Sequence, residues 1–348
     1  MSALHASTAQ RLARSTVAVL SGGGSGEREV SLDSGREIQR ALSAADGRGP
    51  SRVLAVELDA RGRWRVGEEW LPAGAALSAL QEVDVFFIAL HGGAGEDGTL
   101  QGLLESAVRC YTGSGVRASA VCMDKLATRG IAAACGVRTS PAVCFTPQDY
   151  ARDAEGCLAR AAALSPEAVV AKPRCGGSSV LTAIVTAGES LRPIVEQVLA
   201  SGDDCLIEAR VAGVECSCGV LGNRGEPARA LPPVEILPAA GRFFDYQQKY
   251  SSDGAREVCP PQSLGKDAVE RVQAAALALY AATGCDGYAR IDFIVPAQGE
   301  PVVLEVNTLP GFTSRSLLPQ EAAAVGMDYR SLCLWVLEAA LRRVERRT

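Results

Sequence analysis

Two apolar segments in the last third of the chain constrain the fold most strongly. Residues 287–295 (GYARIDFIV) and 302–311 (VVLEVNTLPG) each contain an apolar or alternating run with the length of a β-strand. The short segment between them contains two prolines and a glycine, which favour a turn. The sequence therefore predicts a β-hairpin across residues 287–311.

Three side chains of this hairpin carry oxygen atoms that could bind a cation. Asp292 lies in the first strand, and Glu305 and Asn307 are two residues apart in the second, so they project from the same face. Two carboxylates and an amide suit Mg²⁺, which keeps part of its coordination shell for water and nucleotide phosphates. The alternative is a solvated hairpin with ordinary surface acids, but three polar groups inside apolar strands favour the metal site.

Length and composition limit the class of protein. A chain of 348 residues exceeds the usual size of one hydrophobic core, so we expect two or three domains. The apolar share of 47% and the charged share of 22% are typical of a folded α/β protein. The net charge of −5 argues against nucleic acid as a partner, and no apolar run approaches the roughly 20 residues that span a bilayer.

The cysteines and the N-terminal residues bear on cellular location. Twelve cysteines are scattered mostly among alanines and valines, without a CxxC pair, and the chain has only two histidines. This pattern argues against zinc and indicates buried, reduced thiols in a cytoplasmic protein. Residues 1–15 lack the apolar stretch of a secretory signal, so we expect a short flexible extension there.

The N-terminal third follows a β-α-β pattern. A predicted strand at residues 16–20 leads into a glycine-rich loop at 21–26, and Glu27 then opens a helix. Such an arrangement can present backbone N–H groups to an anion, although many loops of this kind only turn the chain. Further strands at residues 52–58 and 83–90 predict a parallel sheet.

A second glycine-rich loop follows the strand at residues 83–90 and begins with His91. Loops that follow the carboxyl ends of parallel strands lie at one edge of the sheet, where ligands bind. His91 is therefore a candidate binding residue. It could equally be a hydrogen-bonded hinge for the loop.

Two lysines in the middle of the chain stand out. Lys125 begins a predicted helix that runs to about residue 134, and Lys172 ends the apolar strand at 168–172. Lys125 could be an ordinary exposed lysine or could reach a phosphate. Residues 174–179 form a glycine- and serine-rich loop that could cover a triphosphate. Residues 240–262 are a predicted lid, because residues 241–254 within them are polar, aromatic and irregular.

In their order and spacing these motifs resemble those of the D-alanine:D-alanine ligases of the ATP-grasp fold. The resemblance covers nearly the whole chain from about residue 17. It rests on residues 23–32, 89–92, 95–102, 111–115, 123–125, 172–173, 177–180, 244–246, 249–250, 287–292 and 304–308.

The resemblance implies an α/β (α+β) architecture with three domains after the extension at residues 1–15. A Rossmann-like N-terminal domain would span residues 16–115 and a central ATP-grasp domain residues 116–207. A C-terminal ATP-grasp domain, residues 208–348, would carry the metal site and the lid. ATP would lie between the last two domains.

The implied reaction joins two D-alanine molecules through a D-alanyl phosphate, releases ADP and phosphate, and supplies peptidoglycan precursors. ATP would be the co-substrate, with two Mg²⁺ or Mn²⁺ ions, in a homodimer. Alternatives are a ligase that joins D-alanine to D-lactate or D-serine, a ligase for a larger acid, and a non-catalytic ATP-binding paralogue. The resemblance favours D-alanine over D-lactate as the second substrate, because the depsipeptide-forming relatives generally carry a different lid with a histidine, whereas this lid has Lys249 and Tyr250 and no histidine.

The resemblance also assigns roles to individual residues. The candidate catalytic groups are Glu27, Ser178 and Tyr250, in one hydrogen-bonded cluster, with Arg290 and the N–H of Gly311 as donors to the oxyanion. The candidate substrate-binding residues are His91, Ser316 and Leu317, the last two at the carboxylate of the second D-alanine.

ATP would be held by Lys125 and Lys172 at the phosphates, Glu208, Ala209 and Val211 at the adenine, Glu215 at the ribose and Lys249 at the γ-phosphate. Asp292, Glu305 and Asn307 would bind the metal ions, with Glu305 between them.

Taken singly, several of these side chains also suit ordinary structural roles, such as an acid at a helix N-terminus for Glu27 or an internal ion pair for Arg290.

Three positions depart from the family pattern. Leu181 replaces a glycine after the phosphate loop, Arg210 replaces an aromatic or apolar hinge residue, and Leu309 replaces serine or methionine. None of these changes removes a proposed ligand or catalytic group, so we expect activity.

Overall fold

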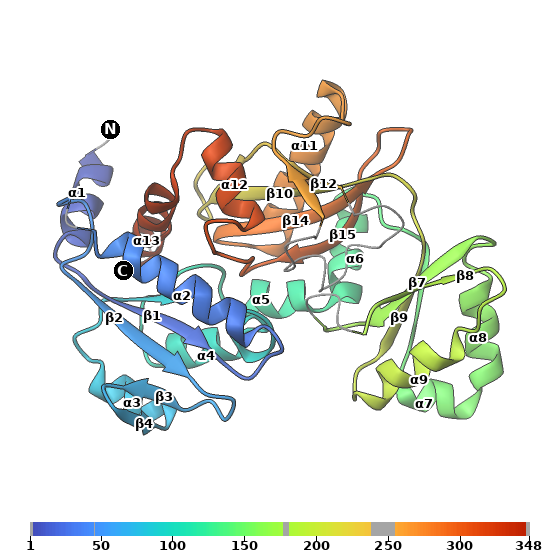
Figure 1. Ribbon diagram of the computed structural model, residues 1–348, viewed down its shortest axis with the longest axis horizontal. Coiled ribbons are helices and arrows are strands. Elements are labelled where there is room, and N and C mark those ends of the chain that lie inside the picture. Colours follow the sequence, from blue (N-terminus) through green and yellow to red (C-terminus); the bar gives the residue numbers. More distant parts are fainter. Residues whose placement is uncertain (1–2, 45, 177–180, 238–254, 346–348) are drawn as a thin grey trace.

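The computed structural model describes residues 3–44, 46–176, 181–237 and 255–345. In these residues the chain forms three β-sheets, each with its own helices (Figure 1). The three sheets follow one another along the sequence. Their connections bring segments from all three to one cleft.

The first sheet has the strand order β4-β3-β2-β1-β5. Its centre is parallel: β1 (Thr16–Gly22) pairs with β2 (Arg52–Leu58) on one side and with β5 (Val85–Ile88) on the other. This confirms the predicted β-α-β pattern. The antiparallel strands β3 (Trp64–Val66) and β4 (Glu69–Leu71) extend the edge, and they are too short to give a periodic signal in the sequence.

Helices from both ends of the chain complete the core of this first unit. The helices nearest in sequence are α2 (Arg28–Leu42), α3 (Ala73–Ala79), η1 (Gly93–Gly95) and α4 (Thr99–Ser106). The C-terminal helix α13 (Tyr329–Glu345) returns to the same core, where Leu337 and Leu341 are buried with Val19 and Phe87.

The first residues of the chain are helical where a flexible extension was predicted. Helix α1 (Ala3–Leu12) contacts α13, and Leu12 is buried in the same core (Figure 1). The prediction is therefore wrong for this segment. It failed because the apolar partner of α1 lies at the other end of the sequence.

The second sheet is antiparallel, with the order β6-β9-β7-β8. Its strands are β6 (Ala142–Phe145), β7 (Ala168–Pro173), β8 (Ala183–Thr186) and β9 (Cys205–Ala209), and its helices are α7 (Pro147–Arg152), α8 (Ala154–Ala162) and α9 (Arg192–Ala200). The helices pack on one face through Phe145, Val169, Val195 and Ile207. Val170, Lys172 and Glu208, which alternate with these core residues along the strands, line the cleft.

The third sheet contains the predicted hairpin, in the order β13-β12-β10-β14-β15, with β11 pairing to β10. Its strands are β10 (Val214–Gly222), β11 (Arg229–Ala230), β12 (Val234–Leu237), β13 (Arg256–Val258), β14 (Gly287–Val295) and β15 (Val302–Asn307). Strands β14 and β15 are antiparallel neighbours, which confirms the hairpin.

Helices α11 (Lys266–Thr283), α5 (Val116–Met123) and α6 (Lys125–Ala134) cover one face of the third sheet, and α12 (Leu317–Ala324) packs against β10 and β12. The domain boundaries stay a prediction. Helices α5 and α6, which open the predicted central domain at residue 116, share a hydrophobic core with the third sheet.

No helix among the residues described has the length and hydropathy needed to cross a membrane.

All twelve cysteines lie in the described part of the chain and are free thiols, and only Cys175 among them is exposed. This agrees with the predicted reduced state.

Candidate active site

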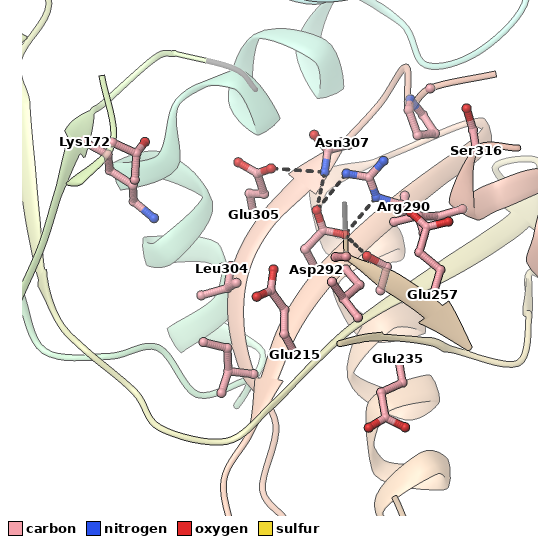
Figure 2. A pocket seen from close by; sticks show the side chains of 18 of the residues that line it. Lys172, Glu215, Glu235, Glu257, Arg290, Asp292, Leu304, Glu305, Asn307 and Ser316 are labelled. Carbon is pink, nitrogen blue, oxygen red and sulfur yellow. Dashed lines mark hydrogen bonds and ion pairs between the residues drawn. The ribbon is translucent and has the colours of Figure 1, made fainter. Parts of the chain in front are cut away.

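A cleft of about 1680 Å³ is lined by residues from all three sheets. It gathers candidates that are far apart in the sequence, among them Glu27 from the first unit, Lys172 and Glu208 from the second, and Asp292 and Ser316 from the third. Figure 2 shows the part of the cleft around the β14–β15 hairpin. The fold therefore brings together motifs that the sequence could only show one by one.

Alternation along the strands of the third sheet builds the floor of the cleft. Ser217, Arg290 and Asp292 line the cleft, whereas their neighbours Cys216 and Ile291 are buried in the core beneath α11. A strand directs successive side chains to opposite faces, so one face is polar and the other apolar. The polar residues inside these apolar strands are thus cleft residues.

Asp292 is the centre of a dense hydrogen-bond network (Figure 2). Arg290 donates to it twice, from Nε to Oδ1 and from Nη2 to Oδ2, both at 2.8 Å. Ser217 Oγ donates to Oδ1 at 2.6 Å, and Asn307 Nδ2 donates to Oδ2 at 3.0 Å. Asp292 is 8% exposed, so these donors compensate a buried negative charge.

The hairpin side chains fit a hard divalent cation. Asp292 lies opposite Glu305 in the strand register, and Asn307 Nδ2 is 3.4 Å from Glu305 Oε1. Rotation of the Asn307 amide by half a turn would replace its N–H donors by its oxygen. The three side chains could then give a cation three oxygen ligands, as the sequence predicted.

Lys125 points into the cleft beside this set. Its side chain is 9% exposed, its Nζ lies 3.5 Å from Glu305 Oε2, and it donates to the carbonyl of Gly176. Asp124 caps α6 by accepting from the N–H groups of Leu126 and Ala127, both at 3.0 Å. Lys125 is therefore not an ordinary exposed lysine.

A buried ion-pair cluster lies at the other end of the cleft. Lys172 Nζ is 2.5 Å from Glu208 Oε2, and Arg129 pairs with Oε1 of the same carboxylate. Arg129 also donates to the carbonyl of Ser140. Residue 129 lies four residues after Lys125 on α6, so both side chains project from the same side of the helix. That spacing was the signal by which the sequence could have revealed Arg129.

The other residues predicted to hold the adenine and the ribose also line the cleft. Ala209 ends β9, Arg210 and Val211 follow it, and Glu215 lies on β10. The backbone N–H of Ala209 donates to the carbonyl of Pro141 at 2.9 Å, so this connection is fixed to the second sheet.

His91 joins the first unit to the loop after β15. Its Nδ1 lies 3.1 Å from the carbonyl of Leu309, and its Nε2 lies 3.1 Å from Ser34 Oγ. Burial lowers the pKa of His91, so the ring is neutral, with Nδ1–H donating to Leu309 and Nε2 accepting from Ser34. These contacts support the hinge interpretation, although His91 also lines the cleft.

Glu27 and Glu96 lie close to the second glycine loop. A side chain on Gly92 would come within 3.0 Å of Glu27 Oε2, and Gly92 has a φ of +65°, so only glycine suits this position. Glu96 accepts from the N–H of Gly92 at 2.9 Å and from the N–H of Leu309 at 3.4 Å. Burial, reinforced by the charge of Glu27, raises the pKa of Glu96 to about 7.

Glu96 is expected to make the protein less stable as the pH rises from about 5 to about 7. Its pKa is raised from 4.5 to about 7, so in this window the folded protein keeps a proton that the unfolded chain has lost. The free energy of unfolding therefore falls with rising pH. Urea unfolding at several pH values measures this slope, and Glu96→Gln should remove the part due to Glu96. An identical slope in the variant would contradict the assignment.

The loop after β15 and the start of α12 line another side of the cleft. Ser316 Oγ lies 3.1 Å from the N–H of Thr313 and 2.9 Å from Thr313 Oγ1. A side chain on Gly311 would come within 3.0 Å of Ser316 Oγ, which explains a glycine there. Leu317 begins α12, so the helix presents its N-terminal N–H groups to the cleft, where a carboxylate can bind.

Several predicted features fall outside the described residues. These are Ser178 with the loop at 177–180, and Lys249 and Tyr250 with most of the lid. The end of the predicted lid is described, and there β13 (Arg256–Val258) pairs with β12, a strand that was not predicted. Short strands of three residues give little periodic signal.

Leu181 has a φ of +58°, in the left-handed region that β-carbons disfavour. This conformation explains why glycine is usual at this position. Leucine there carries backbone strain of roughly 1 to 2 kcal/mol next to the predicted phosphate loop.

Four residues with contacts in or beside the cleft were not proposed as site residues from the sequence, although one of them, Glu96, lies in a motif of the resemblance; they are Ser217, Glu96, Glu257 and Glu321. Most of these residues can be identified only from their contacts with segments that are distant in the sequence. Only the alternation along β10, which places Ser217 on the face of Glu215, could have found one of them.

Comparison with known proteins gives a consistent result. Models of the N-terminus and the C-terminus of D-ala D-ala ligases match residues 16–114 and 131–338. The chain is 38% identical over 340 residues to the D-alanine–D-alanine ligase of Citrifermentans bemidjiense, covering 97% of this chain and 100% of the relative.

Two solved structures are also similar. The D-alanine–D-alanine ligase from Bacillus anthracis complexed with ATP has a TM-score of 0.76 at 30% identity, over 96% of this chain and 100% of that one. The VanG D-Ala:D-Ser ligase from Enterococcus faecalis has a TM-score of 0.76 at 27% identity, over 94% and 99%.

Proposed function

This chain belongs to the D-alanine–D-alanine ligase family, and on that premise we propose how its ATP-grasp cleft performs the ligation. The enzyme joins two D-alanine molecules, uses ATP and releases ADP and phosphate, which supplies D-alanyl-D-alanine for peptidoglycan precursors. The observation that carries the proposal is the cleft itself, where Asp292, Glu305 and Asn307 face the buried lysine Lys125.

ATP binds between the second and third sheets. Lys125 and Lys172 contact its phosphates, and the position of both ammonium groups at the buried wall of the cleft, beside the carboxylates of Glu305 and Glu208, supports this role. The adenine lies against Glu208 and the backbone of Ala209 and Val211, and the ribose lies at Glu215. Lys249, proposed for the γ-phosphate, belongs to the lid outside the described residues.

Asp292, Glu305 and Asn307 would hold two Mg²⁺ or Mn²⁺ ions, which supply charge neutralisation for phosphoryl transfer. The donor set supports this, since it consists of hard oxygen groups at the polar face of the sheet. Lys125 adds a fixed positive charge 3.5 Å from Glu305. Lys125 and the cation ligands would thus place positive charge where negative charge develops on the transferred phosphoryl group.

The first D-alanine must be activated, because a carboxylate is a poor electrophile. Transfer of the γ-phosphoryl group to its carboxylate gives D-alanyl phosphate. Glu27 holds the ammonium of this first substrate, beside the loop that His91 anchors. The amine of the second D-alanine then attacks, after losing its proton to the cluster of Glu27, Ser178 and Tyr250.

Attack on the acyl phosphate creates a tetrahedral oxyanion. Arg290 and the N–H of Gly311 stabilise it, and both line the cleft. Ser316 and the N-terminus of α12 at Leu317 hold the carboxylate of the second D-alanine. Favourable placement of such donors is typically worth about 3 kcal/mol each in the transition state.

The purified protein is expected to release phosphate from ATP with D-alanine and Mg²⁺ alone. Parallel reactions that add D-lactate or D-serine test the second substrate, because the fold is shared with a D-Ala:D-Ser ligase and does not decide this point. Product analysis by mass spectrometry separates dipeptide from depsipeptide. Phosphate release that requires D-lactate or D-serine would refute D-alanine as the second substrate, and nucleotide binding without turnover would indicate a non-catalytic protein.

We also propose a homodimer in the cytoplasm. The twelve free thiols support a reducing compartment. The dimer rests on the family resemblance, and light scattering coupled to size exclusion tests it.

A further inference from the structure

Arg174 directly follows β7 and binds two carboxylates that have no role in the proposed reaction. Its guanidinium donates from Nε to Asp124 Oδ1 at 2.9 Å and from Nη2 to Asp124 Oδ2 at 2.5 Å. Its third nitrogen, Nη1, donates to Asp204 Oδ2 at 3.0 Å. Arg174 is not among the described residues that line the cleft, so any effect on the reaction must act through its neighbours.

The two carboxylates belong to different parts of the structure. Asp124 is the N-cap of α6, a helix that contacts β15 and shares the core of the third sheet (Figure 1). Asp204 directly precedes β9 in the second sheet, and its carbonyl accepts from the N–H of Arg174 at 2.9 Å. The guanidinium of Arg174 therefore ties the beginning of α6 to the second sheet.

The same junction holds Lys125, the first residue of α6. The backbone N–H of Lys125 donates to the carbonyl of Arg174 at 3.1 Å, and its Nζ donates to the carbonyl of Gly176. Lys172, the other lysine proposed for the phosphates, lies on β7 two residues before Arg174. Lys125 and Lys172 thus reach the cleft from two segments that meet at Arg174.

The contact between Arg174 and Asp124 fixes geometry as well as charge. Asp124 accepts from two N–H groups of α6 in addition to the guanidinium, and the hydrogen bonds from Arg174 are the main cause that lowers its pKa. The planar fork of an arginine that binds both oxygens of one carboxylate allows little freedom of orientation. The position at which α6 begins is therefore set relative to the end of β7.

We propose that Arg174 is a positioning residue that fixes Lys125 and Lys172 relative to each other at the phosphates of ATP. The inference rests on the proposed contact of both lysines with ATP. Two ammonium groups can hold one triphosphate only if their separation matches it, and α6 and β7 belong to different hydrophobic cores. The bonds from Arg174 to Asp124 join these two segments and so set that separation.

Calorimetric titrations of Arg174→Ala with ATP and with adenosine, each in the presence of Mg²⁺, test the proposal. The dissociation constant of ATP should rise about tenfold, because misplaced lysines bind the phosphates less well. That of adenosine should stay within about twofold, since adenosine has no phosphates. The ion pair is partly exposed and contributes little to stability, so the Tm should fall by no more than about 4 °C.

Two further variants separate geometry from charge. Arg174→Lys keeps the positive charge but loses the fork, so we expect an intermediate loss of ATP affinity. Asp124→Asn keeps an N-cap acceptor for α6 but loses the ion pair, and it should weaken ATP binding as much as Arg174→Ala does. The double variant should bind ATP no more weakly than either single variant, because both changes break the same contact.

Arg192→Ala is the matched control. Arg192 lies on α9 beside the second sheet and likewise pairs with two carboxylates, Glu155 at 2.5 Å and Glu196 at 3.3 Å, outside the residues that line the cleft. Its replacement should leave both dissociation constants unchanged. An unchanged ATP affinity in Arg174→Ala would overturn the proposal. Equal losses of ATP and adenosine affinity would overturn it too, because they indicate a general structural role.

Lys125→Ala and Lys172→Ala in the same titrations separate the inference from the proposed function. If neither variant weakens ATP binding, the lysines do not hold the phosphates and the inference fails with their proposed role. If both weaken it while Arg174→Ala does not, only the inference on Arg174 is overturned. The titrations contain no D-alanine, so a failure of ligation would leave a positive result on Arg174 standing.

Discussion

Replacing Arg290 with alanine is expected to lower turnover about 100-fold or more while ATP binding persists. The side chain lines the same cleft as the residues proposed for the second substrate, and it is not among the residues proposed to hold ATP. A donor that acts on the oxyanion contributes mainly in the transition state, so its loss lowers kcat more than it changes substrate affinity. Phosphate release at saturating substrate and calorimetric titration with ATP measure the two effects.

Arg290→Lys is the control for charge. Lysine keeps a positive charge beside Asp292 but loses the planar fork that binds both carboxylate oxygens. We expect turnover between the wild-type and alanine values, with a Tm close to the wild type. Wild-type turnover in the alanine variant would show that Arg290 is only the ion-pair partner of Asp292.

The cleft illustrates what local sequence pattern can and cannot reveal. The hairpin at β14 and β15 was predictable because period-two alternation and a proline-rich turn are local signals, and they also fixed Asp292 and Glu305 on one face. The strand at Arg52–Leu58 was predicted with its observed limits for the same reason. Neighbouring residues in the sequence determine all of these features.

The partners of the candidate residues were not predictable in this way. Glu208 is paired with Arg129 from a helix 79 residues earlier, and His91 binds a carbonyl 218 residues later. Such contacts depend on how the three sheets pack, which no local pattern encodes. The roles of Lys172 and Arg290 came from the resemblance to a family, and the structure adds the ion pairs that hold them.

Glu321 is the sharpest example of this limit. In the sequence it is one glutamate in an alanine-rich helix, where a solvent-exposed position would be expected. Only the register of Gly219 against Arg290 shows that its carboxylate fills the place of a missing side chain. A glycine in one strand and an acid in a distant helix are informative together and uninformative apart.

Glu305→Gln is expected to reduce turnover about 1000-fold at millimolar Mg²⁺, because the proposed ligand between the two cations contributes several kcal/mol of charge stabilisation. The substitution keeps the shape of the side chain and leaves Asp292 with its donors from Arg290 and Ser217. Folding should therefore be preserved, and Tm measured without nucleotide should match the wild type.

A titration with Mg²⁺ distinguishes a cation ligand from a general electrostatic effect. If Glu305 binds the cations, the variant should need a higher Mg²⁺ concentration for half-maximal turnover, and its ADP affinity should lose most of its dependence on Mg²⁺. Glu300→Gln, in the turn of the same hairpin and paired with Arg271 at 3.7 Å, is the matched control and should behave as the wild type. An unchanged Mg²⁺ requirement in Glu305→Gln would mean that its carboxylate serves Lys125, 3.5 Å away, instead of a cation. In that case the hairpin would orient the phosphate-binding lysine, and the cation site would have to be sought elsewhere in the cleft.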